Sequence, residues 1–265
     1  MPSDAARRYI PTPLVSAVAA VRAARARRNP AARADAEEQM RLILGPVGRE
    51  HDVPAAAGRY LLRQAYRGEA RWHPRLASRQ PVDGAEHLAG IEGGAVLNFL
   101  HHGLYDGIFA SVRAATGRAV TVIVDPNHLA PDALPWKRQH IRVVSRGGPI
   151  LAADAGYPSM LERVRDGEIV ALATDVPHRL SVHFLGRERR GAFGAAKLAM
   201  DSGAPMVVAT SHPYGRHGAR VRLHAPLHPA DFASGADLLQ AALAIHEPAL
   251  LAWPEAYDKP NLRWG

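Results

Sequence analysis

The stretch LNFLHHGLYDG, residues 97–107, decides how the rest of the chain is interpreted. An apolar run typical of a buried β-strand ends at His101, the chain turns at Gly103, and a carboxylate follows at Asp106, five positions after the histidine. A neutral imidazole can take a proton from a nucleophile, and a carboxylate beside it fixes its tautomer and stabilises the imidazolium that forms. The spacing therefore predicts His101 as a general base and Asp106 as the acid that orients it.

The context of this pair separates it from other matches to the same spacing. About one match is expected by chance in a chain of this composition, and His87 and His183 also precede an acidic residue by five positions. Only the His101 pair is preceded directly by an apolar segment, 95–100, and followed by a helix-like segment, 108–115. Catalytic groups favour the carboxyl ends of strands in α/β sheets. A catalytic role for the pair is therefore about as well supported as the alternative, a hydrogen-bonded turn without catalytic function.

The composition limits the class of protein. A chain of 265 residues suffices for one large α/β domain with a substantial core, and no linker-like stretch divides it. Cysteine is absent, which excludes disulfides, thiolate zinc sites and cysteine nucleophiles and is compatible with a reducing cytoplasm. The sequence has no run of about 18 apolar residues and no signal peptide. We therefore expect a cytoplasmic protein, soluble or peripheral on the inner membrane face.

The charge indicates the kind of partner. A formal charge of +8 favours polyanionic partners such as phosphates, an acidic carrier protein or anionic lipid. Nucleic acid is not expected, because aromatic residues make up only 6% of the chain and no recognition module is legible. The segment 14–28 carries arginines beside valines, so one face could rest on an anionic membrane. The alternative, which we favour, is a solvated helix packed on the domain.

Hydrophobic periodicity changes along the chain. The amino-terminal third is helical in pattern, with helices expected at 14–28, 31–44 and 55–68. From Gly94 onward, short β-rich runs alternate with helical segments, which is typical of parallel strands joined by crossover helices. Strands are expected at 95–100, 119–124, 141–144, 169–174, 181–185, 205–210 and 220–224. Helices are expected at 107–115, 131–139, 157–166, 192–202 and 236–251.

These patterns predict an α/β fold with a mostly parallel central sheet and flanking helices, preceded by a helical amino-terminal segment. We expect residues 1–80 to form that helical segment, packed on the core, and residues 81–265 to form the α/β core, so that the chain is a single domain overall.

Several motifs, taken together, resemble one family. The block from His101 to Asp106 resembles the first block of the lysophospholipid acyltransferase superfamily, in particular its lipid A biosynthesis lauroyl/myristoyl acyltransferase branch. In that block the histidine is followed two residues later by glycine, which assigns the family's histidine to His101 rather than His102. Further segments that resemble the family follow in the same order, at 146–148, 166–175, 182–186, 191–199, 203–207, 253–257 and 263–264.

The resemblance implies a glycerolipid acyltransferase-like fold and an activity. It implies transfer of an acyl group from an acyl-CoA or acyl carrier protein thioester to a hydroxyl or amine, with no permanently bound cofactor. Two departures leave the acceptor open between a membrane lipid and a soluble biosynthetic intermediate. The apolar anchor helix of the lipid A enzymes is missing, and residues 174–177, TDVP, stand where glycerolipid relatives carry a P-E-G element.

The absence of cysteine and of a G-x-S-x-G elbow favours direct transfer over a covalent acyl-enzyme. For the oxyanion, and for positioning the donor, we predict Arg146 with the backbone amides near Gly147 and Gly148, against the alternative of an ordinary turn. The resemblance suggests that a cluster of three arginines meets the phosphates of coenzyme A or of a carrier's phosphopantetheine, although a solvated loop is the competing interpretation. This cluster consists of Arg187, Arg189 and Arg190.

The remaining expectations concern the acyl chain, metals and rival functions. Four residues flanking the motif are candidates for an acyl channel, namely Phe99, Leu104, Tyr105 and Phe109. The histidine spacings elsewhere lack matching ligands, so no metal is expected. A catalytically silent lipid-binding or partner-binding protein of the same fold and a thioester hydrolase are the rival functions.

Overall fold

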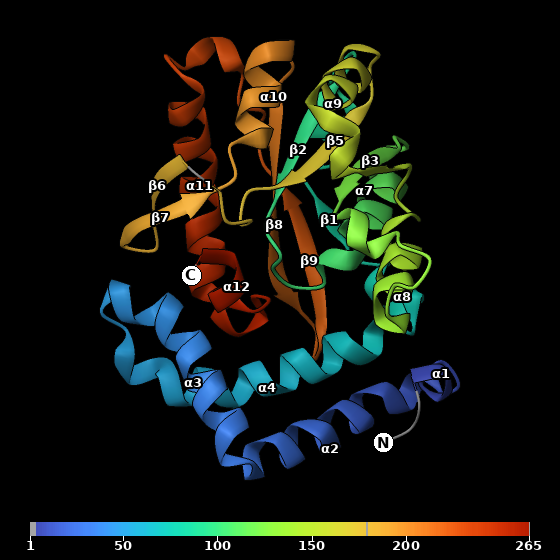
Figure 1. The fold of residues 1–265 in the computed structure, drawn as a ribbon, viewed down its shortest axis with the longest axis vertical. Coiled ribbons are helices and arrows are strands. Elements are labelled where there is room, and N and C mark those ends of the chain that lie inside the picture. Colours follow the sequence, from blue (N-terminus) through green and yellow to red (C-terminus); the bar gives the residue numbers. More distant parts are fainter. Residues whose placement is uncertain (1–3, 179, 265) are drawn as a thin grey trace.

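The computed structural model describes residues 4–178 and 180–264, and its centre is a seven-stranded sheet with the order β1-β9-β8-β2-β5-β3-β4 (Figure 1). All neighbouring strands are parallel except β8 and β9. The mostly parallel α/β architecture predicted from the sequence is therefore confirmed. The strands are β1 Val82–Asp83, β2 Ala95–Phe99, β3 Val120–Val124, β4 Ile150–Ala152, β5 Ile169–Ala173, β8 Met206–Tyr214 and β9 Gly218–Leu223.

Strand β2 lies in the middle of the sheet and is buried along its whole length. Val96 belongs to the core cluster on one face, whereas Leu97 and Phe99 belong to the cluster on the other. A strand covered on both faces loses the polar and apolar alternation of a half-exposed strand. This double burial explains why its sequence appears as one apolar run.

Helices cover both faces of the sheet. On one face lie α9 (Gly156–Arg165), α10 (Gly194–Ser202) and α11 (Gly235–Ala252). On the other lies α7 (Ile108–Thr116), with α6 (Glu86–Ala89) and α8 (Pro135–Val144) packed against it. Within the described residues, no helix combines the length and the apolar character that crossing a bilayer requires.

The amino-terminal helices form a separate layer at one end of the sheet, which Figure 1 shows in blue below the strands. Their bounds are α1 Asp4–Arg7, α2 Val15–Arg28, α3 Pro30–Leu44, α4 Val53–Ala70 and α5 Pro74–Ala77. Helices α2 and α3 pack on α4, and α4 packs on the short 3-10 helix η8 (Pro254–Ala256). The last helix, α12 (Pro260–Trp264), contacts α3, so the carboxyl-terminal segment packs against this layer.

The predicted strand at 141–144 is wrong, because these residues are the last turn of α8. Pro135 occupies the start of that helix, where its fixed φ favours helix initiation. Gln139 and Val143, four positions apart, are both buried, so the β-branched residues of this segment serve a helical face.

The predicted strand near 181–185 exists but is not part of the main sheet. It is β6 (Leu180–Phe184), which pairs antiparallel with β7 (Arg187–Gly191) in a separate hairpin. The two-residue turn has positive φ at both Leu185 and Gly186, 53° and 70°, as the common type I′ hairpin requires. Strand β7 was not predicted, because its charged residues carry no apolar signal.

Candidate active site

His101 and Asp175 meet at the carboxyl edge of the sheet. Strands β2 and β5 are parallel neighbours in which Phe99 pairs with Ala173, and each of the two side chains follows its strand by two residues. The imidazole Nδ1 lies 2.8 Å from Asp175 Oδ1, and the backbone N–H of His101 donates to Oδ2 over 2.8 Å. Because an ionised carboxylate can only accept, Nδ1 carries the proton and Nε2 is left as a proton acceptor.

Asp175 is ionised although it is completely buried. Burial alone would raise the pKa of this carboxyl, but the charge and hydrogen bonds of His101, together with the charge of Arg263, lower the pKa well below its usual range. The His101 side chain is 17% exposed, whereas that of Asp175 is 0% exposed. The arrangement thus presents an imidazole to the outside, with a buried negative charge behind it that can stabilise an imidazolium.

A buried polar network supports the end of β5. Asn98, a polar residue within the apolar β2, donates through Nδ2 to Thr174, the residue before Asp175. Asn98 Oδ1 therefore accepts, and its partner at 2.9 Å is Nε2 of His246 on α11. Burial lowers the pKa of His246 to about 3, so this histidine is neutral and serves as a fixed donor. The network links β2, β5 and α11 beneath His101.

The prediction that Asp106 orients His101 is wrong in this structure. Asp106 is bound instead by Arg71, whose Nε lies 2.6 Å from Oδ2, and by His140, whose Nδ1 lies 3.0 Å from Oδ1. The turn at Gly103 and the 3-10 helix η4 (Tyr105–Gly107) carry the carboxylate to the side of α4 and α8.

The ring of Tyr105 lies next to both histidines. Its centroid is 4.7 Å from that of His101 and 6.0 Å from that of His140. Two histidine–carboxylate pairs, His101–Asp175 and His140–Asp106, thus lie beside this ring. Asp175 could have been found from the sequence as an acid at the carboxyl end of a second predicted strand, but only with the pairing of β2 and β5 known.

The carboxyl-terminal segment holds the loop that carries His101. The backbone N–H of Asp258 donates to the carbonyl of His101 over 2.9 Å, and that of Gly103 donates to the carbonyl of Ala256 over 3.1 Å. The Asp258 carboxylate accepts from the Tyr105 hydroxyl over 3.0 Å and is paired with Arg67. These bonds fix the loop on both sides of the histidine.

Gly103 is required by the shape of this loop. Its φ is +70°, and a Cβ at this position would lie 2.7 Å from the Cβ of Ser211 on β8. Any other residue would combine an unfavourable backbone conformation with a steric clash.

The predicted oxyanion residues lie at the other edge of the sheet. The carbonyl of Gly147 accepts from the backbone N–H of Val120, the first residue of β3. Val120 is in register with Ile169, which pairs with Ala95 at the amino end of β2. His101 lies beyond the carboxyl end of β2, more than about 13 Å along the strand direction at ~3.3 Å per residue. The assignment of Arg146, Gly147 and Gly148 to the oxyanion is therefore wrong, and the two glycines instead allow close packing on α7 and β3.

The three predicted carrier-binding arginines do not share one environment. Arg189 is 4% exposed, and its guanidinium donates to the carbonyls of Leu42, over 2.7 Å, and Phe184, over 3.3 Å. Burial lowers its pKa to about 10. The prediction that Arg189 binds a carrier is therefore wrong, because its side chain instead joins β7 to α3. Arg187 and Arg190 are exposed on β7, and their role remains a prediction.

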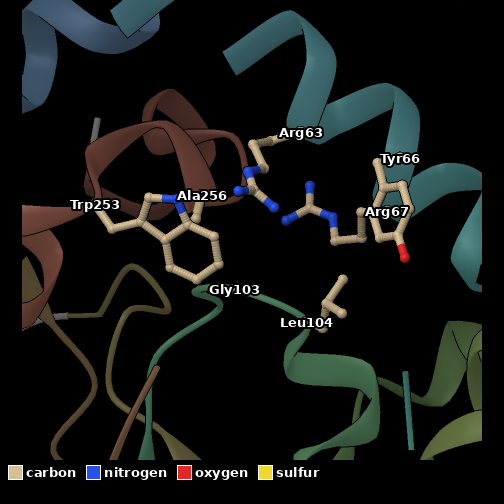
Figure 2. A pocket seen from close by; sticks show the side chains of 7 residues that line it. All are labelled: Arg63, Tyr66, Arg67, Gly103, Leu104, Trp253 and Ala256. Carbon is tan, nitrogen blue, oxygen red and sulfur yellow. The ribbon is translucent and has the colours of Figure 1, made fainter. Parts of the chain in front are cut away.

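The four residues predicted to line an acyl channel are all buried. Phe109 packs edge-on against Phe99, with ring centroids 5.0 Å apart, in the core between the sheet and α7. Leu104 lines a hollow between α4 and the carboxyl-terminal segment, which Figure 2 shows with the guanidinium groups of Arg63 and Arg67 pointing into it. That hollow has room for about one water molecule, so it does not hold an acyl chain in this conformation.

Two histidines at the β8 and β9 end of the sheet share one hydroxyl partner. The hydroxyl of Thr210 lies 2.9 Å from Nε2 of His212 and 2.8 Å from Nε2 of His224. In the described part of the chain, no three or more His, Asp or Glu side chains are grouped so as to hold a metal ion.

The sequence matches a known protein family. Residues 55–257 match the model of the bacterial lipid A biosynthesis acyltransferase family, a range that includes both histidine–carboxylate pairs. No curated protein matches the sequence. Among solved structures, the crystal structure of the 1-acyl-sn-glycerophosphate (LPA) acyltransferase PlsC from Thermotoga maritima is similar, with 14% sequence identity, 71% of this chain and 79% of that chain covered, and a TM-score of 0.43.

Proposed function

Because the chain belongs to the bacterial lipid A biosynthesis acyltransferase family and is thus an acyltransferase, we propose that His101 is its general base and Asp175 the residue that positions it. The two-point contact of His101 with a buried, ionised Asp175 carries this proposal. The acyl donor is a thioester of coenzyme A or of an acyl carrier protein, and the acceptor is a hydroxyl or an amine.

The reaction is a direct transfer in a ternary complex. Nε2 of His101 takes the proton of the acceptor as the acceptor atom forms a bond to the thioester carbon. The tetrahedral intermediate then collapses, the carbon–sulfur bond breaks, and the departing thiolate takes the proton back from the imidazolium. A cysteine acyl-enzyme has no place in this scheme, since the chain contains no cysteine. Asp175 keeps its charge throughout and stabilises the imidazolium.

The donor's anionic part binds at the exposed side of β7. Arg187 and Arg190 are the exposed arginines of the predicted three-residue cluster, and β7 contacts α12, the helix that carries Arg263. Guanidinium groups bind phosphates through paired hydrogen bonds, so these two arginines suit a pantetheine phosphate or the phosphates of coenzyme A.

The acceptor is either a membrane lipid or a soluble biosynthetic intermediate. Leu14 and Val21 of the first long helical segment are 53% and 54% exposed, and arginines such as Arg25 lie near them. Exposed apolar and cationic side chains on one helix suit a peripheral contact with anionic lipid on the cytoplasmic face. Other parts of that helix are occupied, because Val15 is buried and Arg22 is paired with Glu69.

A thiol-release assay tests the proposal. Wild type and His101→Ala are incubated with acyl-CoA and acyl carrier protein thioesters of graded chain length, in the presence of a lipid extract or a soluble metabolite extract. We expect wild type to release thiol and form an acylated acceptor, detected by mass spectrometry, and His101→Ala to lose at least about 100-fold in rate.

Arg33→Ala is the control, because Arg33 is exposed on α3. Free fatty acid without any acylated acceptor would instead indicate a thioester hydrolase. No thiol release from any donor would indicate a binding protein, and full activity of a folded His101→Ala variant would exclude the proposed base.

A further inference from the structure

The proposed reaction needs a positive group near His101 that can bind the oxyanion. Attack on a thioester places a negative charge on the former carbonyl oxygen, and preorganised donors at that oxygen supply much of the catalysis. The residues first predicted for this role lie at the opposite edge of the sheet. Four guanidinium groups lie around the His101 loop at the carboxyl edge, those of Arg63, Arg67, Arg71 and Arg263. Arg63 lies over the ring of Trp253 and donates to the backbone carbonyl of His217.

Two of these four cations are already neutralised by buried carboxylates. Arg71 holds Asp106 at 2.6 Å, and the two side chains are 12% and 3% exposed. Arg67 is paired with Asp258, with side chains 8% and 10% exposed. Moving either guanidinium to a substrate would leave a buried carboxylate without its partner, which is costly.

Arg263 differs from both in its contacts. It lies on α12, its side chain is 20% exposed, and its contacts with Asp258 are long, 3.5 Å from Nη2 to Oδ2 and 3.4 Å from Nε to the backbone oxygen. A guanidinium has five N–H donors, so several remain available to a ligand.

The position of Arg263 relative to the base follows from the same contacts. Asp258, which it touches, donates its backbone N–H to the carbonyl of His101. The charge of Arg263 also lowers the pKa of Asp175, the other member of the dyad. Burial alone would lower the pKa of Arg263, but the charges of Asp175, Asp258 and the neighbouring tyrosines raise it. The guanidinium is therefore charged, and Asp258 links it to the loop that carries His101.

We propose that Arg263 binds the oxyanion of the tetrahedral intermediate in the reaction proposed above. As the acceptor atom bonds to the thioester carbon, the carbonyl π electrons move to oxygen, and that oxygen accepts hydrogen bonds from the guanidinium while His101 holds the acceptor's proton. When the carbonyl re-forms, the electron pair of the carbon–sulfur bond leaves with sulfur, which takes the proton from His101. Arg263 itself neither gains nor loses a proton.

Steady-state kinetics of Arg263→Gln, Arg263→Lys and Arg263→Ala tests this role. Stabilisation of charge that forms only during the reaction predicts a fall in kcat of about 100-fold for Gln, with the donor KM changed little. Lysine should restore part of the rate, and added guanidinium chloride at a non-denaturing concentration should rescue the Ala variant in a saturable way. Arg33→Gln, on the exposed surface of α3, is the matched control.

A kcat of Arg263→Gln equal to that of wild type would overturn the proposal. A loss of rate that guanidinium does not rescue, accompanied by a lower unfolding temperature, would also overturn it, because the residue would then serve only to hold Asp258.

Binding of octylphosphonate, a stable anion with an alkyl chain, gives a readout that does not depend on turnover. By titration calorimetry we expect Arg263→Gln to bind it at least about tenfold more weakly than wild type, and Arg33→Gln to bind it equally. Equal affinity of wild type and Arg263→Gln would overturn the assignment. If wild type released no thiol but bound the phosphonate in an Arg263-dependent way, the proposed acyl transfer would fail while the anion site would stand.

Discussion

Two histidine–carboxylate pairs lie beside the ring of Tyr105, and they differ in what binds the carboxylate. Asp175 receives both of its short hydrogen bonds from one residue, His101. Asp106 shares its two oxygens between His140 and the guanidinium of Arg71. The first carboxylate can therefore respond to a charge that develops on its histidine, whereas the second is already neutralised by a permanent cation.

On the proposed assignment, a histidine next to an acid is not by itself a catalytic unit. Burial alone would raise the pKa of Asp106, but Arg71 and His140 lower the pKa far below its usual range. The three residues come from the end of α4, from η4 and from α8, so the ion pairs join elements that are distant in sequence. This second pair is suited to holding the site together, and the first to moving a proton.

Replacement of Asp175 by asparagine should give the largest loss of activity and distinguish its role most clearly from that of Asp106. Asp175→Asn preserves shape but removes the charge that stabilises the imidazolium, and it favours the wrong tautomer of His101. We expect kcat to fall about 10³-fold to 10⁴-fold, as in other histidine–aspartate systems. The check is thiol release from an acyl thioester together with its pH profile, which should change in shape. Activity within tenfold of wild type would remove the distinction between the pairs.

Asp106→Asn should act mainly on stability. It leaves the guanidinium of Arg71, which is paired in the interior, without its carboxylate, and loss of one partner of a buried ion pair costs about 3–5 kcal/mol of unfolding free energy. Urea denaturation measures this loss. The remaining folded protein should keep its kcat within a few fold at low temperature. A stable Asp106→Asn protein with a kcat as low as that of Asp175→Asn would show that Asp106 takes part in the chemistry.

The pH dependence of the unfolding free energy should distinguish the two histidine–carboxylate pairs from the buried neutral histidines near them, His102 and His246. Burial lowers the pKa of His102 to about 4 and that of His246 to about 3, below the ~6.5 of an unfolded chain. As the pH falls from 7 to 5, the unfolded state takes up protons that the folded state does not, so the free energy of unfolding should fall by on the order of 3 kcal/mol.

The carboxylates Asp175 and Asp106, whose pKa values are lowered, contribute losses only below about pH 4. His102→Gln, which can still donate to the carbonyl of Trp253, should reduce the slope between pH 7 and 5 by about half. Urea titrations at several pH values provide the measurement, and an unchanged slope in the variant would contradict the assignment.

His140→Asn should give the smallest effect. The amide can replace Nδ1 as a donor to Asp106, and Arg71 remains in place, so we expect a loss of about 1–2 kcal/mol in stability and no more than a threefold change in kcat. Thermal unfolding and the same thiol-release assay test both numbers. A kcat loss of 100-fold or more would place His140 in the reaction.

Features that depend on local sequence were predicted, whereas features that depend on contacts between distant segments were not. Strands β2, β3 and β5 and helices α7, α9, α10 and α11 were predicted because a run of apolar residues or a helical period is a local signal. The segment 141–144 was misassigned because β-branched residues also fill a buried helical face. Family resemblance predicted the acyltransferase class, which the family match confirms, whereas the role of His101 stays a prediction.

The partner of His101 could not be derived in the same way. Asp106 is five positions from the histidine, but a turn of non-helical backbone directs it elsewhere. Asp175 reaches His101 because β2 and β5 are paired in a particular register, and register is a property of the sheet rather than of either segment. Arg263 was noted only as part of a family-like ending, because its position depends on the docking of α12.

The bonds from Ala256 and Asp258 to the His101 loop also set an order of events in synthesis. The Tyr105 hydroxyl and its Asp258 partner are separated by 153 residues, so the loop leaves the ribosome long before its support does. A nascent chain that has emerged only through β9 contains Asp175 and Ser211, which bind this loop, but lacks the bonds from residues 256–258. The enzyme should therefore transfer acyl groups more slowly during translation than after residues 256–258 have docked.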